Sequence, residues 1–174
     1  MNDTIRNIKS RRSVKKYKSD MVPEELIDEI VSAGTCAPTG MNKQSPIILS
    51  ITNKEVRDKL SKLNAKVLGN ENIDPFYNAP VILVVLADKN VSTYLYDGSL
   101  VMGNMLLAAH SLGLGACWIH RAKEVFESNE GKELLLSLGI EGNYEGIGNC
   151  VVGYIDGEMR EPVKIKENYV YKVN

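Results

Sequence analysis

The sequence predicts one domain with a central β-sheet and helices on its faces. At 174 residues, the chain has the length of about one domain with a single hydrophobic core. Apolar runs typical of strands, at 47–52, 81–87, 114–120 and 150–155, are separated by segments with helical spacing of apolar residues. No repeat, linker or change in composition marks a boundary, so we expect residues 1–174 to form one domain.

The helices are expected from apolar residues three and four positions apart and from residues that favour helix ends. They lie at 3–10, 23–34, 53–63, 93–112 and 122–138, the last as one or two helices. Pro23 and Asn53 favour helix starts, whereas Gly34 and Gly139 favour helix ends. The helix at 93–112 is apolar nearly all round, which is typical of a helix buried in the core.

The strands differ in how much cover they need. Residues 81–87 are a continuous run of leucine, alanine and β-branched residues, typical of a strand covered on both faces. The segment 161–174 instead alternates, with apolar side chains at odd positions, and no helix follows to cover it. Such a strand needs a sheet edge, which another subunit can provide. We therefore expect 156–174 to be an extended tail that packs on a partner subunit.

Composition excludes several classes of function. A formal net charge of −1 argues against a dedicated nucleic-acid binder, because duplex affinity depends on neutralising phosphates. Glycines at 113 and 115 divide the apolar stretch 99–119, so we expect no membrane span. The three cysteines are far apart without zinc spacing, which predicts reduced thiols and no metal site. The N-terminus lacks the apolar core of a secretory signal, which predicts a cytoplasmic protein.

A short basic segment is the first candidate binding site. It contains Arg11, Arg12, Ser13, Lys15 and Lys16. In an extended backbone Arg11, Ser13 and Lys15 share one side, where they can surround a phosphate dianion. The alternative is a solvated basic face between two helices. Lys164 and Lys166 repeat this spacing, and a C-terminal tail can bring them to the same anion.

The loop 38–44 is the second candidate. The carboxamides of Asn42 and Gln44 and the backbone donors around Gly40 suit the edge of a planar heterocycle. The alternative is a turn stabilised by its own Asn and Thr side chains. No predicted strand is followed by a G-x-G-x-x-G or P-loop motif, so neither a Rossmann nor a P-loop nucleotide site is supported.

Isolated histidines and a cysteine carry weaker signals. We expect His110 to be a core histidine hydrogen-bonded to backbone, whereas His120 ends a strand, where sites tend to form. Cys36 is expected to be a small buried residue at a helix end, with a reactive thiol as the alternative. Neither histidine pairs recognisably with a Ser or Cys, and there is no G-x-S-x-G, so a nucleophilic triad is not supported.

Taken together and in order, the motifs resemble the FMN-dependent nitroreductase family. They are Arg-Arg-Ser-x-Lys-x-Tyr, Ala-Pro-Thr-Gly-Met-Asn-Lys-Gln, Asn-Ala-Pro-Val-Ile-Leu-Val-Val, Gly-Leu-Gly-Ala-Cys-Trp-Ile and Val-Val-Gly-Tyr. The resemblance spans about residues 4 to 155, and the collinear set is specific although each motif is weak. It implies an α+β fold with a mixed central β-sheet flanked by helices, an intertwined homodimer, and two FMN sites at the subunit interface.

The resemblance also implies a role for each candidate residue. One subunit would hold the FMN phosphate, ribityl chain and pyrimidine edge with Arg11, Ser13 and Lys15, with Arg12 as a helper. The other subunit would contribute Pro38, Thr39, Gly40 and Asn42, with Gln44 nearby. The other side of the flavin, where family members present backbone donors to N5, would be lined by Trp118, Ile119, His120 and Arg121. The phosphate site would be completed by Lys164 and Lys166.

Two departures from the family pattern concern the substrate cavity. The family usually has Pro-Trp after Asn-x-Gln, whereas here Gln44 is followed by Ser-Pro-Ile, without the aromatic residue. The connection 64–78 is also short where larger members carry lid helices. Asn70 and Asn72 are the candidates for the asparagine that touches the pyrimidine.

The activity implied by the resemblance is a ping-pong reaction of an NAD(P)H oxidoreductase. Hydride passes from NADH or NADPH to flavin N5, the nicotinamide leaves, and an acceptor such as a nitroaromatic or a quinone is reduced in the vacated site. No side chain is assigned as a catalytic acid or base. The alternatives are a family enzyme with a dedicated acceptor or dehalogenating chemistry, a non-catalytic flavin carrier, and a protein whose basic segment binds a polyanion.

Overall fold

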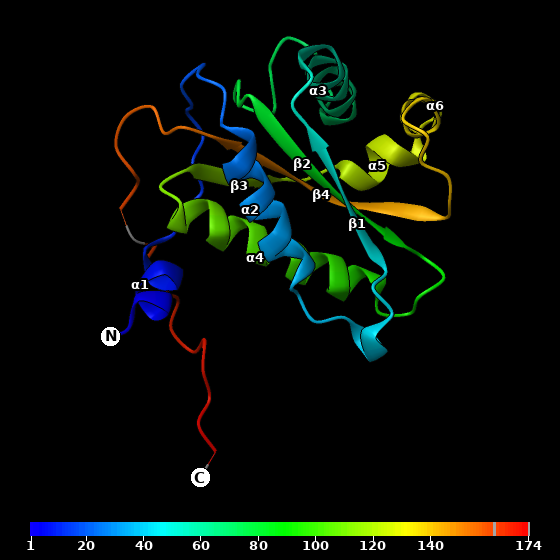
Figure 1. Cartoon of the computed structure of the whole chain (residues 1–174). Coiled ribbons are helices and arrows are strands. Elements are labelled where there is room, and N and C mark those ends of the chain that lie inside the picture. Colours follow the sequence, from blue (N-terminus) through cyan, green and yellow to red (C-terminus); the bar gives the residue numbers. More distant parts are fainter. Residues whose placement is uncertain (162, 174) are drawn as a thin grey trace.

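The computed structural model describes residues 1–161 and 163–173, and its elements follow the predicted order (Figure 1). The helices are α1 (Asp3–Ser10), α2 (Glu24–Thr35), the 3₁₀ turn η1 (Gly40–Asn42), α3 (Lys54–Leu68), α4 (Tyr94–Ser111), α5 (Ala122–Glu127) and α6 (Asn129–Ser137). The strands are β1 (Pro46–Ile51), β2 (Val81–Asp88), β3 (Gly115–Ile119) and β4 (Tyr144–Gly153). They form one sheet in the order β1-β2-β4-β3 with helices on both faces, which confirms the predicted architecture.

The sheet is antiparallel at each pairing of its four strands, so the expectation of a mixed sheet is wrong for these strands. Ile51 at the end of β1 lies opposite Ile82 at the start of β2. Helix α3 and the connection after it therefore return the chain to the end of the sheet that it has just left. A parallel contact exists only as an isolated bridge between Ser13 and Ala116, within the described part of the chain.

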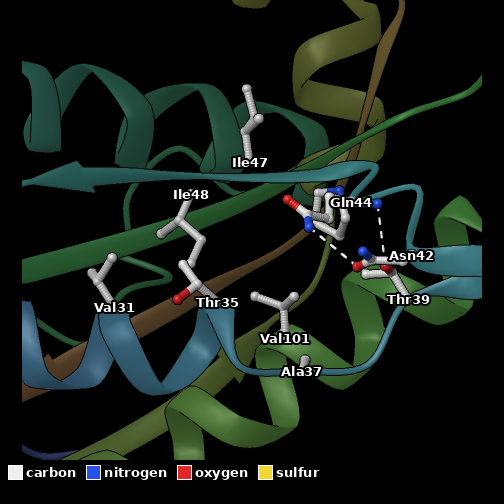
Figure 2. Close-up of a pocket in the computed structure, with 10 residues that line it drawn as sticks. Val31, Thr35, Ala37, Thr39, Asn42, Gln44, Ile47, Ile48 and Val101 are labelled. Atoms are coloured by element: carbon white, nitrogen blue, oxygen red, sulfur yellow. Dashed lines mark hydrogen bonds between the residues drawn. The ribbon is translucent and has the colours of Figure 1, made fainter.

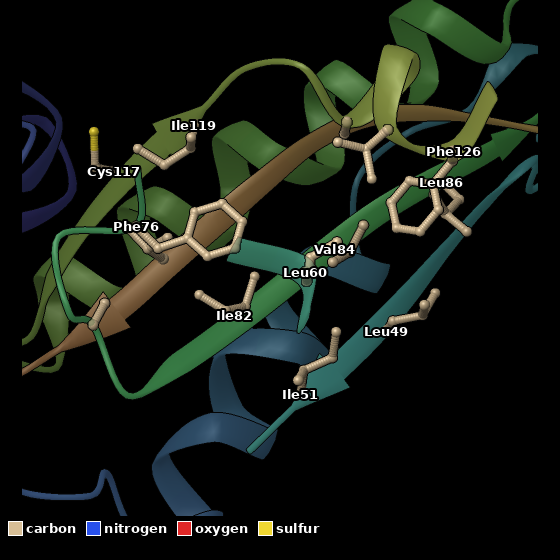
Figure 3. Close-up of a cluster of buried hydrophobic side chains, with 14 of the residues drawn as sticks. Leu49, Ile51, Leu60, Phe76, Ile82, Val84, Leu86, Cys117, Ile119 and Phe126 are labelled. Carbon is tan, nitrogen blue, oxygen red and sulfur yellow. The ribbon is translucent and has the colours of Figure 1, made fainter. Parts of the chain in front are cut away.

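Strand β2 separates two hydrophobic clusters, as expected for a strand covered on both faces. Ile82, Val84 and Leu86 face the cluster formed with α3, α5 and α6 (Figure 3). The alternate residues of β2 face α2 and α4. Every residue from Val81 to Ala87 is fully buried, so period-2 alternation divides one strand between two cores.

Two elements are longer than expected. Strand β4 begins at Tyr144 rather than near Cys150, because its glycines serve close packing rather than a turn. A Cβ at Gly146 would lie 2.3 Å from the Ala122 backbone, and one at Gly148 would lie 2.2 Å from the Trp118 indole nitrogen. Helix α3 continues past Asn64 to Leu68, because the Asn64 side chain is buried and hydrogen-bonded in the core.

Helix α4 is buried on one face only, which corrects the expectation of a fully buried helix. Met102, Met105 and Ala109 have no exposed surface, whereas Tyr96 is 71% exposed and Leu100 is 48% exposed on the outward face. No helix in the part of the chain that the structure describes is long and apolar enough to cross a membrane.

The C-terminal tail runs away from the sheet near α1 (Figure 1). Residues 163–173 form no strand, and the apolar side chains at the odd positions are exposed. Two positions of the predicted tail, Pro162 and Asn174, lie outside the described residues. The tail's packing on a partner stays a prediction.

Candidate functional site

The basic segment is extended and lies along the outer edge of β3. The Val14 N–H donates to the Ala116 carbonyl at 3.1 Å, and Val14 and Tyr17 are buried beneath the segment. Ser13 and Lys15 face solvent on the other side, in agreement with the predicted alternation. The hydroxyl and the ammonium are therefore available to a ligand at this edge.

The two arginines have different surroundings. Nη1 of Arg12 donates to the carbonyls of Lys9 (2.8 Å) and Arg11 (2.7 Å), so Arg12 satisfies carbonyls at the end of α1. Its Nε is buried and has no hydrogen-bond partner among the described residues. Arg11 is half-buried and makes no such bond with its guanidinium in the described part of the chain. Arg11 is thus the better placed of the pair to bind an anion.

His110 helps to fix the end of α1. Its Nε2 lies 2.8 Å from Oγ of Ser10, so its partner is a side chain and not the backbone group that we expected. Helix α1 packs on α4 here and brings the hydroxyl to the ring. Burial lowers the pKa of His110, and the cations Arg11 and Arg12 lower it further.

A cavity of about 650 Å³ opens beside this segment. Its lining includes Arg11, Arg12, Ser13 and Arg160. Guanidinium groups from two segments and a hydroxyl around one cavity are donors that suit a phosphate, although the carboxylate of Glu161 also lines it. These donors therefore fit the phosphate of FMN. Arg160 was not among the predicted site residues, and its only signal was a position in the predicted tail, four residues before Lys164.

The tail lysines do not line this cavity in the described structure. The ammonium of Lys166 lies over the ring of Tyr169, 5.8 Å from its centroid. Lys164 is exposed. Their predicted contribution to the phosphate site therefore requires the tail to take another position.

The end of β3 is held by two buried asparagines. Asn149 donates to the Ile119 carbonyl at 3.3 Å, and Asn64 donates to the His120 carbonyl at 3.0 Å. Asn64 also accepts from Nε of Arg121 at 3.1 Å, while Arg121 adopts a left-handed φ of 74°. The backbone at the end of β3 is thus fixed from inside the protein.

Asn64 was missed by the sequence reasoning. The available signal was an asparagine four positions after Leu60, on the apolar face of α3. Asn70 and Asn72, the earlier candidates, are exposed and share a hydrogen bond of 3.2 Å. His120 is exposed beside this strand end, and Trp118 is half-buried on the α4 side of the sheet.

The loop 38–44 is anchored to the start of α4 through Asp97. This buried carboxylate accepts from the Gly40 N–H (3.0 Å) and from the hydroxyls of Ser45 (2.8 Å) and Thr93 (3.0 Å). A Cβ at Gly40 would lie 2.4 Å from Oγ1 of Thr93, so the close approach requires glycine. Burial alone would raise the pKa of Asp97, but these hydrogen bonds outweigh it and lower the pKa.

The tip of the loop carries the amide groups (Figure 2). Gln44 donates from its side chain to Oδ1 of Asn42 at 3.1 Å and from its backbone to Oγ1 of Thr39 at 3.1 Å. Asn42 and Gln44 have left-handed φ values of 52° and 49°. The loop therefore is a turn stabilised by its own side chains, and it also lines a cavity of about 580 Å³ beneath the edge of β1.

Cys36 is exposed rather than buried, because Ala37 is the residue that turns inward after α2. Pro38 is also exposed. Cys117 is buried against the basic segment, where burial raises the pKa of its thiol despite the opposing effects of Ser13 and Lys15. Among the described residues, no group of His, Cys, Asp or Glu side chains is arranged to hold a metal ion.

The two candidate segments lie at opposite ends of α4 in one chain (Figure 1). The loop contacts Asp97, whereas α1, which leads into the basic segment, contacts His110. Thirteen positions separate these residues, which is about 20 Å along a helix. The structure does not bring the two groups of predicted residues together within one chain.

Comparisons with known proteins identify relatives over about two thirds of the chain. A Methanothermobacter thermautotrophicus protein, provisionally named NADH dehydrogenase/NAD(P)H nitroreductase, is 37% identical over 120 residues, covering 67% of this chain and 60% of the relative. An FMN reductase of Bacillus subtilis is 29% identical over 137 residues, covering 66% of this chain and 53% of the relative. The matched region thus spans little more than half of these relatives.

The fold has full-length counterparts. A nitroreductase of Bacteroides fragilis, solved with bound FMN, superposes with a TM-score of 0.90 at 27% identity, covering 100% of both chains. An FMN-dependent nitroreductase of Clostridium difficile has a TM-score of 0.85 at 26% identity, covering 99% of both chains. The nitroreductase family model matches residues 8–164. The chain therefore belongs to the nitroreductase family.

Proposed function

We propose that this protein is an FMN-dependent NAD(P)H oxidoreductase that acts as a homodimer. The observation that carries the proposal is the cavity lined by Arg11, Ser13 and Arg160, in a chain whose fold matches an FMN-bound nitroreductase along its whole length. The donors suit a phosphate dianion, and the neighbouring Lys15 suits the pyrimidine edge of the same ligand.

The chain's own residues bind and orient the cofactor. Arg11, Ser13 and Arg160 would hold its phosphate, and the strand end fixed by Asn64 and Asn149 would line its ring system. A second copy supplies the loop with Pro38, Thr39, Gly40 and Asn42, with Gln44 nearby. The end of β3 beside the cofactor would be formed by Trp118, Ile119, His120 and Arg121. The phosphate site would be completed by Lys164 and Lys166 when the tail packs against it.

A shared site needs a dimer, and the outward face of α4 supports one. Tyr96, Leu100, Gly103 and Leu107 are spaced by four, three and four positions, so they form a single seam along the helix. A side chain at Gly103 would meet nothing within 4 Å in this chain, which leaves room for a second helix to approach closely. The exposed tail adds apolar surface for the same partner.

Bound FMN would accept a hydride from NADH or NADPH and deliver electrons to an acceptor such as a nitroaromatic or a quinone. The protein's part is binding, orientation and electrostatics, and no side chain is required as an acid or base. Gln44 is followed by Ser-Pro-Ile rather than by an aromatic residue, and the loop lines a cavity of about 580 Å³. Bulky acceptors should therefore be screened together with menadione and a nitroarene.

The first test is the spectrum and turnover of the purified protein. We expect flavin bands at about 370 and 450 nm that bleach under NADH or NADPH and return when an acceptor is added. A protein that stays colourless after addition of FMN would refute the proposal. A yellow protein that never bleaches would instead be a flavin carrier.

The second test addresses the shared site by mixing two defective chains. Arg11→Ala should weaken FMN binding by about 1.5–3 kcal/mol for each charge-assisted hydrogen bond lost, and Asn42→Ala should weaken it from the other side. A mixed dimer of these variants then has one site with both defects and one with neither. Recovery of tight FMN binding in the mixed dimer supports a site built from two chains, whereas a site within one chain gives no recovery.

A further inference from the structure

The turn at 74–78 has an unusual backbone. Tyr77 and Asn78 adopt left-handed φ values of 55° and 57°, although neither is glycine. Successive left-handed residues are unfavourable, and they persist only where the surrounding structure fixes them, often at functional sites.

Asp74 provides that constraint. Its carboxylate accepts hydrogen bonds from the N–H groups of Phe76 (2.9 Å) and Asn78 (2.7 Å), from the hydroxyl of Ser61 (2.6 Å) and from the guanidinium of Arg57. The Phe76 ring has no exposed surface. The residues on both sides of Tyr77 are therefore held, and the orientation of Tyr77 is fixed by them.

The fixed turn presents the Tyr77 ring to Lys15. The Lys15 ammonium lies over the ring, 5.6 Å from its centroid. Its neighbour Lys16 has a different partner, the carboxylate of Asp156 at 2.8 Å. In the described part of the chain, Lys15 makes no ion pair. An aromatic face can hold an ammonium without cancelling its charge, whereas a carboxylate would neutralise it.

We propose that Tyr77 is a positioning residue that holds the Lys15 ammonium at the pyrimidine edge of bound FMN. This inference rests on the proposed function, since it assumes FMN beside Lys15. A positive charge held there favours the reduced cofactor, which carries negative charge on the pyrimidine, over the oxidised cofactor. Tyr77 thus sets the reduction potential of the cofactor through Lys15 and needs no contact with the flavin.

The test compares FMN-loaded Tyr77→Gly with Tyr77→Phe. Glycine suits the left-handed backbone and removes the ring, whereas phenylalanine keeps an aromatic face. Losing the cation–π contact should lower the preference for reduced over oxidised FMN by about threefold, which is about 15 mV for a two-electron couple. We expect this shift in the midpoint potential for Tyr77→Gly and a potential close to wild type for Tyr77→Phe.

The Lys15→Met background separates positioning from a general structural effect. There, Tyr77→Gly should change the potential no further, because the ammonium is already absent. An equal shift in that background, or no shift in Tyr77→Gly, would overturn the inference. Tyr77→Asn, which also tolerates a left-handed φ, repeats the measurement if Tyr77→Gly lowers stability. A wild-type protein that binds no FMN refutes the proposed function first, and the inference with it.

Discussion

Asp74 and Asp97 both point carboxylates inward and hold loops that contain residues with positive φ, but their donors differ. Asp74 forms an ion pair with the buried Arg57 in addition to its hydrogen bonds from neutral groups. Asp97 lies in the first turn of α4, and its partners among the described residues are neutral: the Gly40 N–H and two hydroxyls. One loop depends on a pair of opposite charges, and the other on dipoles around a single charge.

The two carboxylates therefore leave different groups unpaired when either one is removed. Burial alone would raise the pKa of both groups, but hydrogen bonds to the ionised form outweigh it, and the pKa of each is lowered. Without Asp74, the buried guanidinium of Arg57 keeps only the more exposed Asp58 carboxylate, at 3.2 Å, as a counter-charge. Without Asp97, only neutral donors are left unpaired, and the helix N-terminus loses a favourable charge.

Asp74→Ala should therefore have the largest effect. Removing one member of a buried ion pair lowers the free energy of unfolding by about 3–4 kcal/mol, since Arg57 is only 8% exposed. Urea unfolding followed by circular dichroism measures the change. Replacing both partners, Arg57→Met with Asp74→Leu, should restore much of the stability. A double variant that is no more stable than Asp74→Ala would contradict this account.

Asp97→Ala should follow, at about 2–3 kcal/mol, because three neutral donors lose a charged acceptor. The larger consequence is local, since the loop 39–45 is no longer tied to α4. FMN affinity should fall in Asp97→Ala. The control Asp20→Ala, which removes an exposed carboxylate, should change neither FMN affinity nor the free energy of unfolding. Fluorescence titration with FMN and urea unfolding on the same samples test both parts. Unchanged FMN affinity in Asp97→Ala would separate this loop from the site.

Acid should remove part of the same stabilisation. A carboxylate whose pKa is lowered in the folded protein stabilises the fold at pH values above its unfolded pKa of about 3.9. That contribution disappears as the pH falls through the lower folded pKa. The difference in unfolding free energy between wild type and Asp97→Asn should therefore be constant above about pH 5 and shrink toward pH 2. A difference that grows with acid would show that the charge of Asp97 is not what stabilises the loop.

Regular elements could be predicted from the sequence because their signals are local. Asn53 caps α3 with a 3.0 Å hydrogen bond from Val56, and the unbroken apolar run at 81–87 became a strand buried on both faces. The start of β4 was not predictable in this way. In the sequence, Gly146 and Gly148 resemble turn residues. In the structure, the backbone of α5 and the Trp118 ring pack against them, which explains why glycine is needed there.

The candidate site was predicted only in part for the same reason. Arg11, Ser13 and Lys15 share one side of an extended segment, and their chemistry is visible in six residues of sequence. Asn64 and Asp97 act across 56 and 57 positions of sequence, on the His120 carbonyl and the Gly40 N–H. Nothing in their immediate neighbours indicates such partners, because tertiary packing alone brings them together.

The smallest expected effect comes from deleting one hydroxyl group that donates a hydrogen bond to each carboxylate. Thr93→Val deletes one of the three donors to Asp97, whereas Ser61→Ala deletes a donor to Asp74, which keeps its guanidinium. Thr93→Val should lower the free energy of unfolding by about 1.5 kcal/mol and Ser61→Ala by about 0.5 kcal/mol, because a charge without a counter-ion depends more on each neutral dipole. Thr93→Ser keeps the hydroxyl and should stay near wild type in urea unfolding. If Ser61→Ala proves the more damaging, the ion pair does not relieve Asp74 of its need for neutral donors, and the contrast between the two loops fails.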